Sequence, residues 1–177
     1  MIGWNIINYR IHSEQPFQPV FKPMQNDSSK IILGWREWIS LPQLNLPAIK
    51  AKIDTGAKTS ALHAFYVEPY KKESVDMVKF LIHPIQANAE FQVECHATIL
   101  DQRKVADSGG HKEMRYVVES LISIGDKSWP IELSLTNRDT MRFRMLLGRR
   151  AMEYSTLVEP SASYLNGKLN PQILYNL

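Results

Sequence analysis

The sequence predicts an all-β fold, a barrel or a sandwich, and two observations lead to that class. Apolar and polar residues alternate over several short segments, which is the period of a strand with one buried face. Turn-forming residues separate these segments, and a helical pattern occurs in one short stretch, residues 148–157. Short strands joined by turns are typical of barrels and sandwiches.

The strand pattern recurs along most of the chain after residue 30. In the clearest case, Cys95 and Ala97 share an apolar face opposite Glu94, His96 and Thr98. The expected strands are residues 31–41, 48–54, 77–83, 91–100, 115–125, 129–136 and 141–148. We expect these strands to form one domain over residues 31–177, because 177 residues allow one well-buried core.

Residues 1–30 are predicted to form an N-terminal extension. Three prolines, Pro16, Pro19 and Pro23, precede a polar cluster there, and proline removes backbone donors and favours extended chain. No signal-peptide pattern and no apolar run of about 20 residues is present, so we expect a cytoplasmic protein without a membrane partner. Cys95 is the single cysteine, which excludes an internal disulfide. The formal net charge of +3 does not call for a nucleic acid.

An unusual turn follows the strand at residues 48–54. The strand ends on Asp54, then Thr55 can hydrogen-bond a neighbour, and Gly56 permits a close approach of the backbone. Alone, this tripeptide is a common turn. Its combination with a second motif far along the chain, the letters LLGR at residues 146–149, is much rarer.

These motifs resemble those of the retropepsin-like aspartic peptidases. Three longer segments resemble a bacterial branch labelled ATP-dependent zinc proteases, which is often associated with ATP-grasp glutamate ligases. They are AKIDTGAKTSALHA (51–64), DSGGHKEMRYV (107–117) and LTNRDTMRFRMLLGR (135–149). The resemblance covers roughly residues 33–168. It implies a closed acid-protease barrel with one short helix after the LLGR motif.

The resemblance also implies roles for individual residues. Asp54 matches the catalytic aspartate, Thr55 the residue that bonds its symmetry mate, and Gly56 the glycine whose backbone holds substrate. The flap tip is placed at Asp107, Ser108, Gly109 and Gly110, with His111 beside it, and we include these five residues among those that contact substrate. Ala57 and Lys58 are expected to contact substrate as well. Viral retropepsins carry an acid at the position of Lys58 that pairs with the Arg149 equivalent, so Arg149 must find another partner.

Aspartic peptidases need two carboxyl groups about 3 Å apart that share one proton, because two like charges so close cannot both ionise. The chain has a second Asp-Ser-Gly, at residues 107–109, but its place on the predicted flap favours a glycine-rich hairpin tip over a second catalytic acid. We therefore expect a homodimer with Asp54 from each chain at the two-fold axis.

Metal and nucleotide cofactors have little support in the sequence. There is no H-E-x-x-H motif and no phosphate-binding loop of the G-x-x-x-x-G-K-[ST] type. His63 and His111, with Asp107, are weak candidates for a metal site. The alternative interpretation is that these histidines form hydrogen bonds at the surface, or next to the site residues, and bind no metal. We expect no cofactor.

Basic residues surround the motifs. Residues 138–150 hold five arginines and one aspartate, and Arg142, Arg144 and Arg149 are candidates for binding substrate. One interpretation is a solvated outer face, and the other is a basic groove for an acidic, glutamate-rich peptide, because arginine binds carboxylates with a bidentate fork. The predicted function is an aspartic endopeptidase. The alternatives are a non-catalytic peptide-binding module and a zinc-dependent protease.

Overall fold

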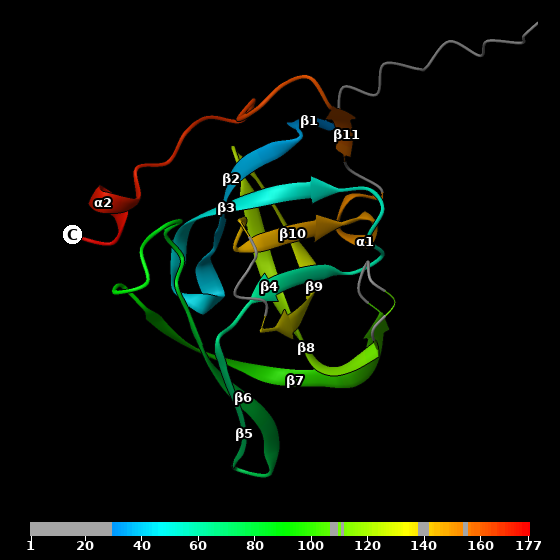
Figure 1. The fold of residues 1–177 in the computed structure, drawn as a ribbon, viewed down its shortest axis with the longest axis vertical. Helices are drawn as coiled ribbons and strands as arrows, with labels where there is room; N and C mark the ends of the chain where they lie inside the picture. Colours follow the sequence, from blue (N-terminus) through cyan, green and yellow to red (C-terminus); the bar gives the residue numbers. More distant parts are fainter. Residues whose placement is uncertain (1–29, 107–109, 111, 138–141, 154–155) are drawn as a thin grey trace, which may run out of the picture.

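The computed structural model describes residues 30–106, 110, 112–137, 142–153 and 156–177 (Figure 1). The predicted all-β class is confirmed. The strands in chain order are β1 (Ile31–Gly34), β2 (Arg36–Leu41), β3 (Leu46–Asp54), β4 (Ser60–His63), β5 (Tyr66–Lys72), β6 (Val75–Ile82), β7 (Val93–Ala106), β8 (Lys112–Ile124), β9 (Lys127–Thr136), β10 (Met145–Gly148) and β11 (Thr156–Glu159). The short helices are η1 (Pro42–Leu44), α1 (Arg149–Met152) and α2 (Pro171–Leu174).

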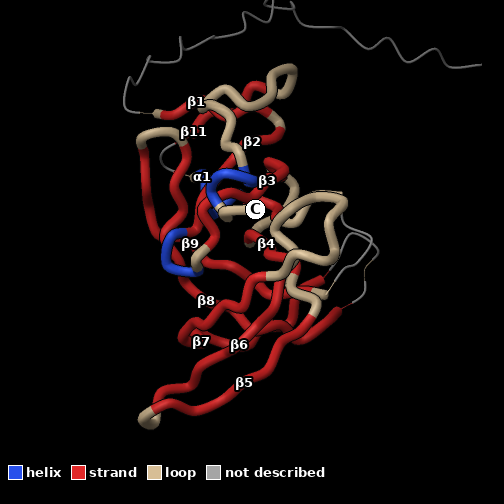
Figure 2. The backbone as a smooth tube through the Cα atoms, turned by 90° about the vertical axis from the view of Figure 1, so that its left-hand side faces the viewer, coloured by secondary structure: helices blue, strands red, loops and turns tan. Residues whose placement is uncertain are grey.

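Nine strands form one sheet that curls on itself. Their order is β2-β3-β10-β4-β9-β8-β7-β6-β5, and β2 also pairs with β8 through Ser40 and Ser123. This last pairing closes the six strands from β2 to β8 into a barrel, and β7, β6 and β5 extend the sheet beyond it as the long layer at the bottom of Figure 2. The predicted barrel is therefore present, with a three-stranded extension.

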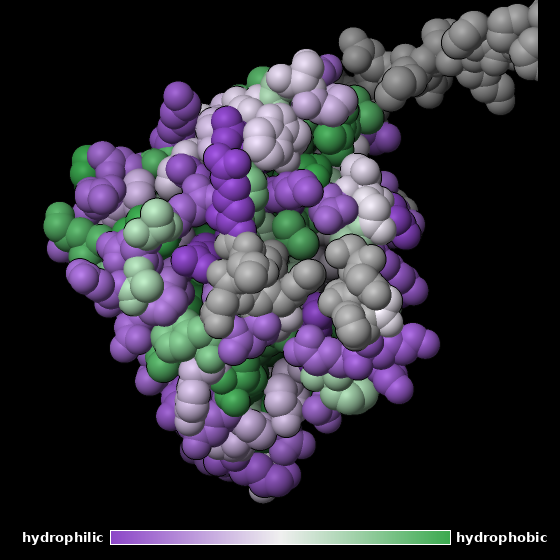
Figure 3. All heavy atoms as spheres, viewed as in Figure 1, coloured by the Kyte–Doolittle hydropathy of each residue, from purple (hydrophilic) through white to green (hydrophobic). Residues whose placement is uncertain are grey.

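The core fills the barrel with aliphatic side chains from most of its strands. Fully buried examples are Ile39 on β2, Ile49 on β3, Leu62 on β4 and Met145 on β10. Complete burial of an aliphatic side chain of this size contributes roughly 1.5–3 kcal/mol. On the surface, hydrophilic side chains surround smaller hydrophobic areas on the face drawn in Figure 3.

Strand β1 does not belong to the main sheet; it pairs with β11 in parallel register. A side chain at Gly34 could not fit, because its Cβ would lie 2.5 Å from the carbonyl oxygen of Ala162. The predicted single strand at residues 31–41 is therefore two strands with a break at Trp35. Beneath the break, the buried Glu37 carboxylate accepts backbone N–H groups from Gly34 and Leu165, at 2.7 and 3.0 Å.

Other boundaries also differ from the sequence prediction. The last expected strand, residues 141–148, begins only at Met145, and residues 142–144 form bends. The short helix expected after the LLGR motif is confirmed as α1, but it ends at Met152, and the last two residues of the expected helical stretch 148–157, Thr156 and Leu157, belong to strand β11. Strands β4, β5 and β11 and the helices η1 and α2 were not predicted. Residues 1–29, nearly all of the predicted extension, lie outside the described residues.

Candidate active site

Asp54 ends β3 and folds its carboxylate back over the turn that follows. Its Oδ1 accepts the backbone N–H of Gly56 at 3.0 Å and that of Ala57 at 3.1 Å. Gly56 packs closely here, because a Cβ at this position would lie 3.2 Å from Oδ1 and the carboxylate would have to move by a few tenths of an ångström. These bonds hold the carboxylate in one orientation at the end of a strand, which is a rigid support for a reacting group.

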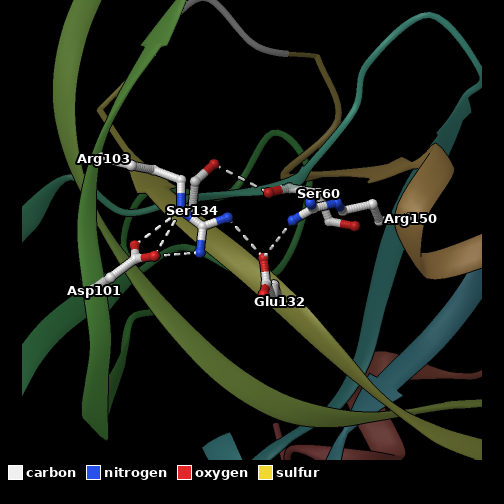
Figure 4. Close-up of polar contacts among 6 residues, drawn as sticks. All are labelled: Ser60, Asp101, Arg103, Glu132, Ser134 and Arg150. Carbon is white, nitrogen blue, oxygen red and sulfur yellow. Dashed lines mark hydrogen bonds and ion pairs between the residues drawn. The ribbon is translucent and has the colours of Figure 1, made fainter.

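Strand β10 runs between β3 and β4, and its register places Gly148 beside Asp54. The glycine is required by space: a Cβ at residue 148 would meet the backbone carbon of Thr59 at 2.6 Å. The N–H of Gly148 donates to the buried Ser60 Oγ at 3.1 Å. Figure 4 shows the neighbouring bond, in which Ser134 Oγ donates to the carbonyl oxygen of Ser60 at 3.0 Å. The two sequence motifs thus meet in one tightly packed crossing.

Arg149 holds the turn from the outside. Its Nη1 donates to the carbonyl oxygens of Thr55 and Gly56, both at 2.9 Å, and its backbone N–H donates to Ala57 O at 2.8 Å. The backbone N–H of Arg150 continues the pattern with Lys58 O at 3.1 Å. The turn carbonyls are therefore the partner that replaces the acid found at the Lys58 position in viral enzymes.

A cleft of about 750 Å³ opens between this turn and the hairpin formed by β7 and β8. Asp54 is the one carboxylic acid among the described residues that line it, whereas several basic side chains face it from different elements. The basic lining residues are Lys58, Arg103, Lys104, Arg115 and Arg150. Gly56, Ala57, Ser134 and Thr136 also belong to the lining.

The β7–β8 hairpin occupies the position expected for the flap. Its strands pair out to Ala106 and Lys112, so residues 107–111 connect them. Gly110 is exposed and has a φ of +82°, a backbone conformation that glycine adopts without strain. The other predicted flap residues, Asp107, Ser108, Gly109 and His111, lie outside the described residues.

A network of charged side chains links the hairpin to α1 (Figure 4). Glu132 on β9 accepts from Arg103 Nη1 at 2.7 Å and from Arg150 Nη1 at 3.4 Å, and Arg103 also binds Asp101. The hydrogen bonds from Arg103 lower the pKa of Asp101, and both carboxylates raise the pKa of Arg103. Two arginines and two acids balance here, and Arg115 pairs with Glu113, which leaves Lys58 and Lys104 as the cleft cations without an ion pair to a described residue.

Some predicted residues lie elsewhere. Arg142 and Arg144 do not line the cleft, because the chain there bends instead of continuing β10. The Arg142 carbonyl oxygen accepts from Gln86 Nε2 at 2.7 Å, and that of Arg144 accepts from the His63 N–H at 2.8 Å. Arg149 and Thr55 line a smaller pocket on the other side of the turn.

His63, a weak metal candidate, is 1% exposed on β4. Within the described residues, no three His, Cys, Asp or Glu side chains are grouped closely enough to hold a metal ion. Among the residues that the structure describes, no helix is long and apolar enough to span a bilayer.

Sequence reasoning missed several cleft residues, namely Arg103, Lys104, Arg115, Ser134, Thr136 and Arg150. Arg150 directly follows the LLGR motif and could have been found from it. The others come from three strands, and no motif signals which of their side chains face Asp54.

Three comparisons place this architecture among known proteins. Residues 32–169 match a family model described as RimB-like, retropepsin-like aspartic endopeptidase RimB. A solved structure from Legionella pneumophila, of a protein described as having unknown function, shares 27% identity with a TM-score of 0.65 over 78% of this chain and 99% of that one.

Curated relatives carry a different name. A protein named "Probable alpha-L-glutamate ligase" from Shewanella halifaxensis is 46% identical over 80% of this chain, and one of the same name from Parasynechococcus marenigrum is 47% identical over 79%. The chain spans about a third of the length of these relatives, 31% and 30% respectively. With the family model covering most of the described domain, the chain belongs to the RimB-like family of retropepsin-like aspartic endopeptidases.

Proposed function

We propose that this protein hydrolyses peptide bonds as an aspartic endopeptidase, with the Asp54 carboxyl groups of two copies paired at a two-fold axis. The observation that carries the proposal is the setting of Asp54. Its Oδ1 is fixed by two backbone N–H groups, and the residue lines a cleft of about 750 Å³. No described residue hydrogen-bonds Oδ2, which suits an oxygen that meets water and a second carboxyl group.

The second copy is needed because the described cleft of one chain contains a single carboxylic acid. Two carboxyl groups about 3 Å apart share one proton, and the proton losses belong to the pair. The ionised member takes a proton from water as the water oxygen attacks the scissile carbonyl carbon, and the protonated member gives its proton to the carbonyl oxygen. When the tetrahedral intermediate collapses, the member that took the proton from water gives it to the amide nitrogen, the other member takes a proton from a hydroxyl of the intermediate, and the C–N bond breaks.

Asp54→Asn tests this mechanism, with Asp76→Asn on the exposed β5–β6 hairpin as the matched control. We expect Asp54→Asn to lower kcat by at least about 10³-fold, because the amide can neither take the proton nor share one. Pepstatin should inhibit the wild type, chelators should not, and the pH optimum should be acidic. Full activity in Asp54→Asn together with loss on chelation would instead indicate a zinc-dependent protease.

We further propose that the substrates are acidic peptides. Five basic side chains line the cleft against one acid, and arginine binds carboxylates in a planar fork. The curated relatives support this, since proteins named as α-L-glutamate ligases contain a region similar to this chain within a longer polypeptide. Peptides ending in a run of glutamates should be cut faster than the same peptides ending in glutamines, and salt should reduce the difference. Indifference to both tail and salt would remove this proposal.

A non-catalytic peptide-binding module is the second candidate, favoured by the single acid in each chain's cleft. In that case no peptide would be cut at any protein concentration, and Asp54→Asn would bind peptides as tightly as the wild type does.

A further inference from the structure

One row of side chains crosses the cleft wall and is not part of the catalytic turn. Arg103 on β7 pairs with Arg115 on β8, and Thr136 on β9 pairs with His63 on β4. The β8–β9 pairing ends at Val117 and Ser134, and Arg115 and Thr136 are each two residues beyond that last pair. Alternate residues of a strand point to the same face, and Arg115 and Thr136 both line the cleft.

The Arg115 guanidinium is buried and incompletely paired. Its side chain is 5% exposed, and its Nε and Nη2 donate to one oxygen of Glu113, at 3.2 and 3.1 Å. Glu113 is itself 50% exposed, so water weakens the pair. An arginine has five N–H donors, and no described residue bonds Nη1. Arg103, by contrast, has its guanidinium bonded to both Asp101 and Glu132.

The hydroxyl group of Thr136 also lacks a hydrogen-bond partner among the described residues. The residue is 1% exposed and lines the cleft, yet within the described part of the chain its Oγ1 has no hydrogen-bond partner. A buried hydroxyl left without a partner costs about 1–3 kcal/mol, and buried polar groups are usually satisfied by protein or by ordered water. The hydroxyl can donate to an anion that Arg115 also contacts.

We propose that Arg115 and Thr136 form a subsite that binds the side-chain carboxylate of an acidic substrate residue close to the scissile bond. The inference rests on the proposed peptidase function and deepens it by assigning the residues that set specificity. The carboxylate accepts from the free edge of the Arg115 guanidinium and from Thr136 Oγ1, and it replaces the exposed Glu113 as the main partner of the buried charge. The same cleft presents Asp54, so a residue held here places its neighbouring peptide bond at the catalytic turn.

Peptide cleavage by two variants provides the first test. The substrates are two peptides that differ at one position, Glu or Gln, next to the cleavage site. Arg115→Gln should lower kcat/KM for the Glu peptide on the order of 10- to 100-fold and leave the Gln peptide within about threefold. Thr136→Val, which keeps the side-chain shape, should lower the same preference by about threefold to tenfold. Lys72→Gln, at the far end of the β5–β6 hairpin, removes one positive charge as a control and should leave the preference unchanged.

Binding in the Asp54→Asn background separates this inference from the catalytic proposal. Fluorescent Glu and Gln peptides are titrated into Asp54→Asn and into the double variants that add Arg115→Gln or Thr136→Val, after thermal melts confirm folding. A preference for Glu that both added substitutions reduce supports the subsite, even if the wild type cuts nothing. Equal affinity for the two peptides, no binding of either, or a preference that survives both substitutions would overturn it.

Discussion

At the scale of single residues, the site depends on positions where even one carbon atom has no room. Gly148 lies against the backbone of Thr59, and the hydroxyl of Ser60 satisfies its N–H. Both neighbours belong to the segment that joins the turn after Asp54 to β4. A side chain at residue 148 would therefore push apart the two motifs that the fold brings together.

Gly148→Ala should destabilise the protein by about 3 kcal/mol, the upper end of the usual cost of overpacking, because the new Cβ meets backbone atoms that cannot rotate away. Urea unfolding followed by circular dichroism measures the change. Gly167→Ala is the control: its φ of +98° brings conformational strain, but a Cβ there meets nothing within 4 Å. Equal losses in the two variants would show that crowding at the crossing is unimportant.

The pKa of the Cys95 thiol depends on its burial in the core. Burial, with a smaller effect of the Glu94 charge, raises the pKa of its thiol to about 12, whereas an unfolded thiol ionises near pH 8.5. Above pH 8.5 the unfolded chain therefore holds fewer protons than the folded one. Stability from this group is complete below that pH and is lost as the pH rises.

Between pH 7.5 and 9.5 the wild type should lose about 1.4 kcal/mol more unfolding free energy than Cys95→Ala does over the same range. Comparing the two slopes removes the cost of the cavity that the substitution leaves. The range also stays below the ionisation of Tyr175, whose pKa is raised to about 12 mainly by burial. Parallel pH profiles for the two proteins would contradict a protonated buried thiol.

At the scale of elements, α1 contacts the turn after Asp54. Its first residue, Arg149, bonds three carbonyl oxygens of the turn, two through its side chain and one through its N–H. The sequence placed Arg149 among the substrate-binding residues. A positioning role and a binding role affect kinetics differently, because the first changes the geometry of Asp54 and the second changes affinity.

Arg149→Met should lower kcat by about 10- to 100-fold with KM nearly unchanged, because the turn loses two charge-assisted hydrogen bonds. Arg149→Lys should restore part of the rate, since an ammonium group still reaches a carbonyl oxygen. Steady-state kinetics on one peptide measures both constants. A raised KM with unchanged kcat would assign Arg149 to substrate binding instead.

The predictability of each element follows from its pattern of burial. Strand β7 was recognised because Cys95 and Ala97 are buried while Glu94 and His96 are exposed. Strand β4 was missed because all four of its residues are buried, which removes the alternation. Strand β5 was missed because most of it is exposed and it contains Pro69, which suits its place at the sheet edge.

The same reasoning explains which parts of the site the sequence contains. Asp54 and Gly56 lie in one contiguous motif and Gly148 in another, and at Gly148 the close backbone of Thr59 leaves no room for a side chain. Arg115 and Thr136 come to the same cleft from two different strands, and the alignment of strands is set by the folded sheet and not by local sequence. The basic cleft was expected from Arg142 and Arg144, yet its basic residues come mostly from β7, β8 and α1.

At the scale of the whole molecule, the fold supplies one half of the proposed catalytic site. The closed barrel supports β3 and β10, the crossing fixes the turn, and the β7–β8 hairpin covers the cleft from the other side. What one described chain lacks is a second carboxyl group beside Asp54. The central claim is therefore that activity requires two copies, each contributing one Asp54.

Subunit mixing tests that claim most directly. Wild type and Asp54→Asn are combined at a constant total concentration, allowed to exchange subunits, and assayed on one peptide, with sedimentation confirming that both proteins dimerise. If each site needs both aspartates, an equal mixture should retain about a quarter of the wild-type rate, because only that fraction of dimers carries two intact chains. Retention of about half, with activity proportional to the wild-type fraction, would mean that each chain works alone and would contradict the paired site.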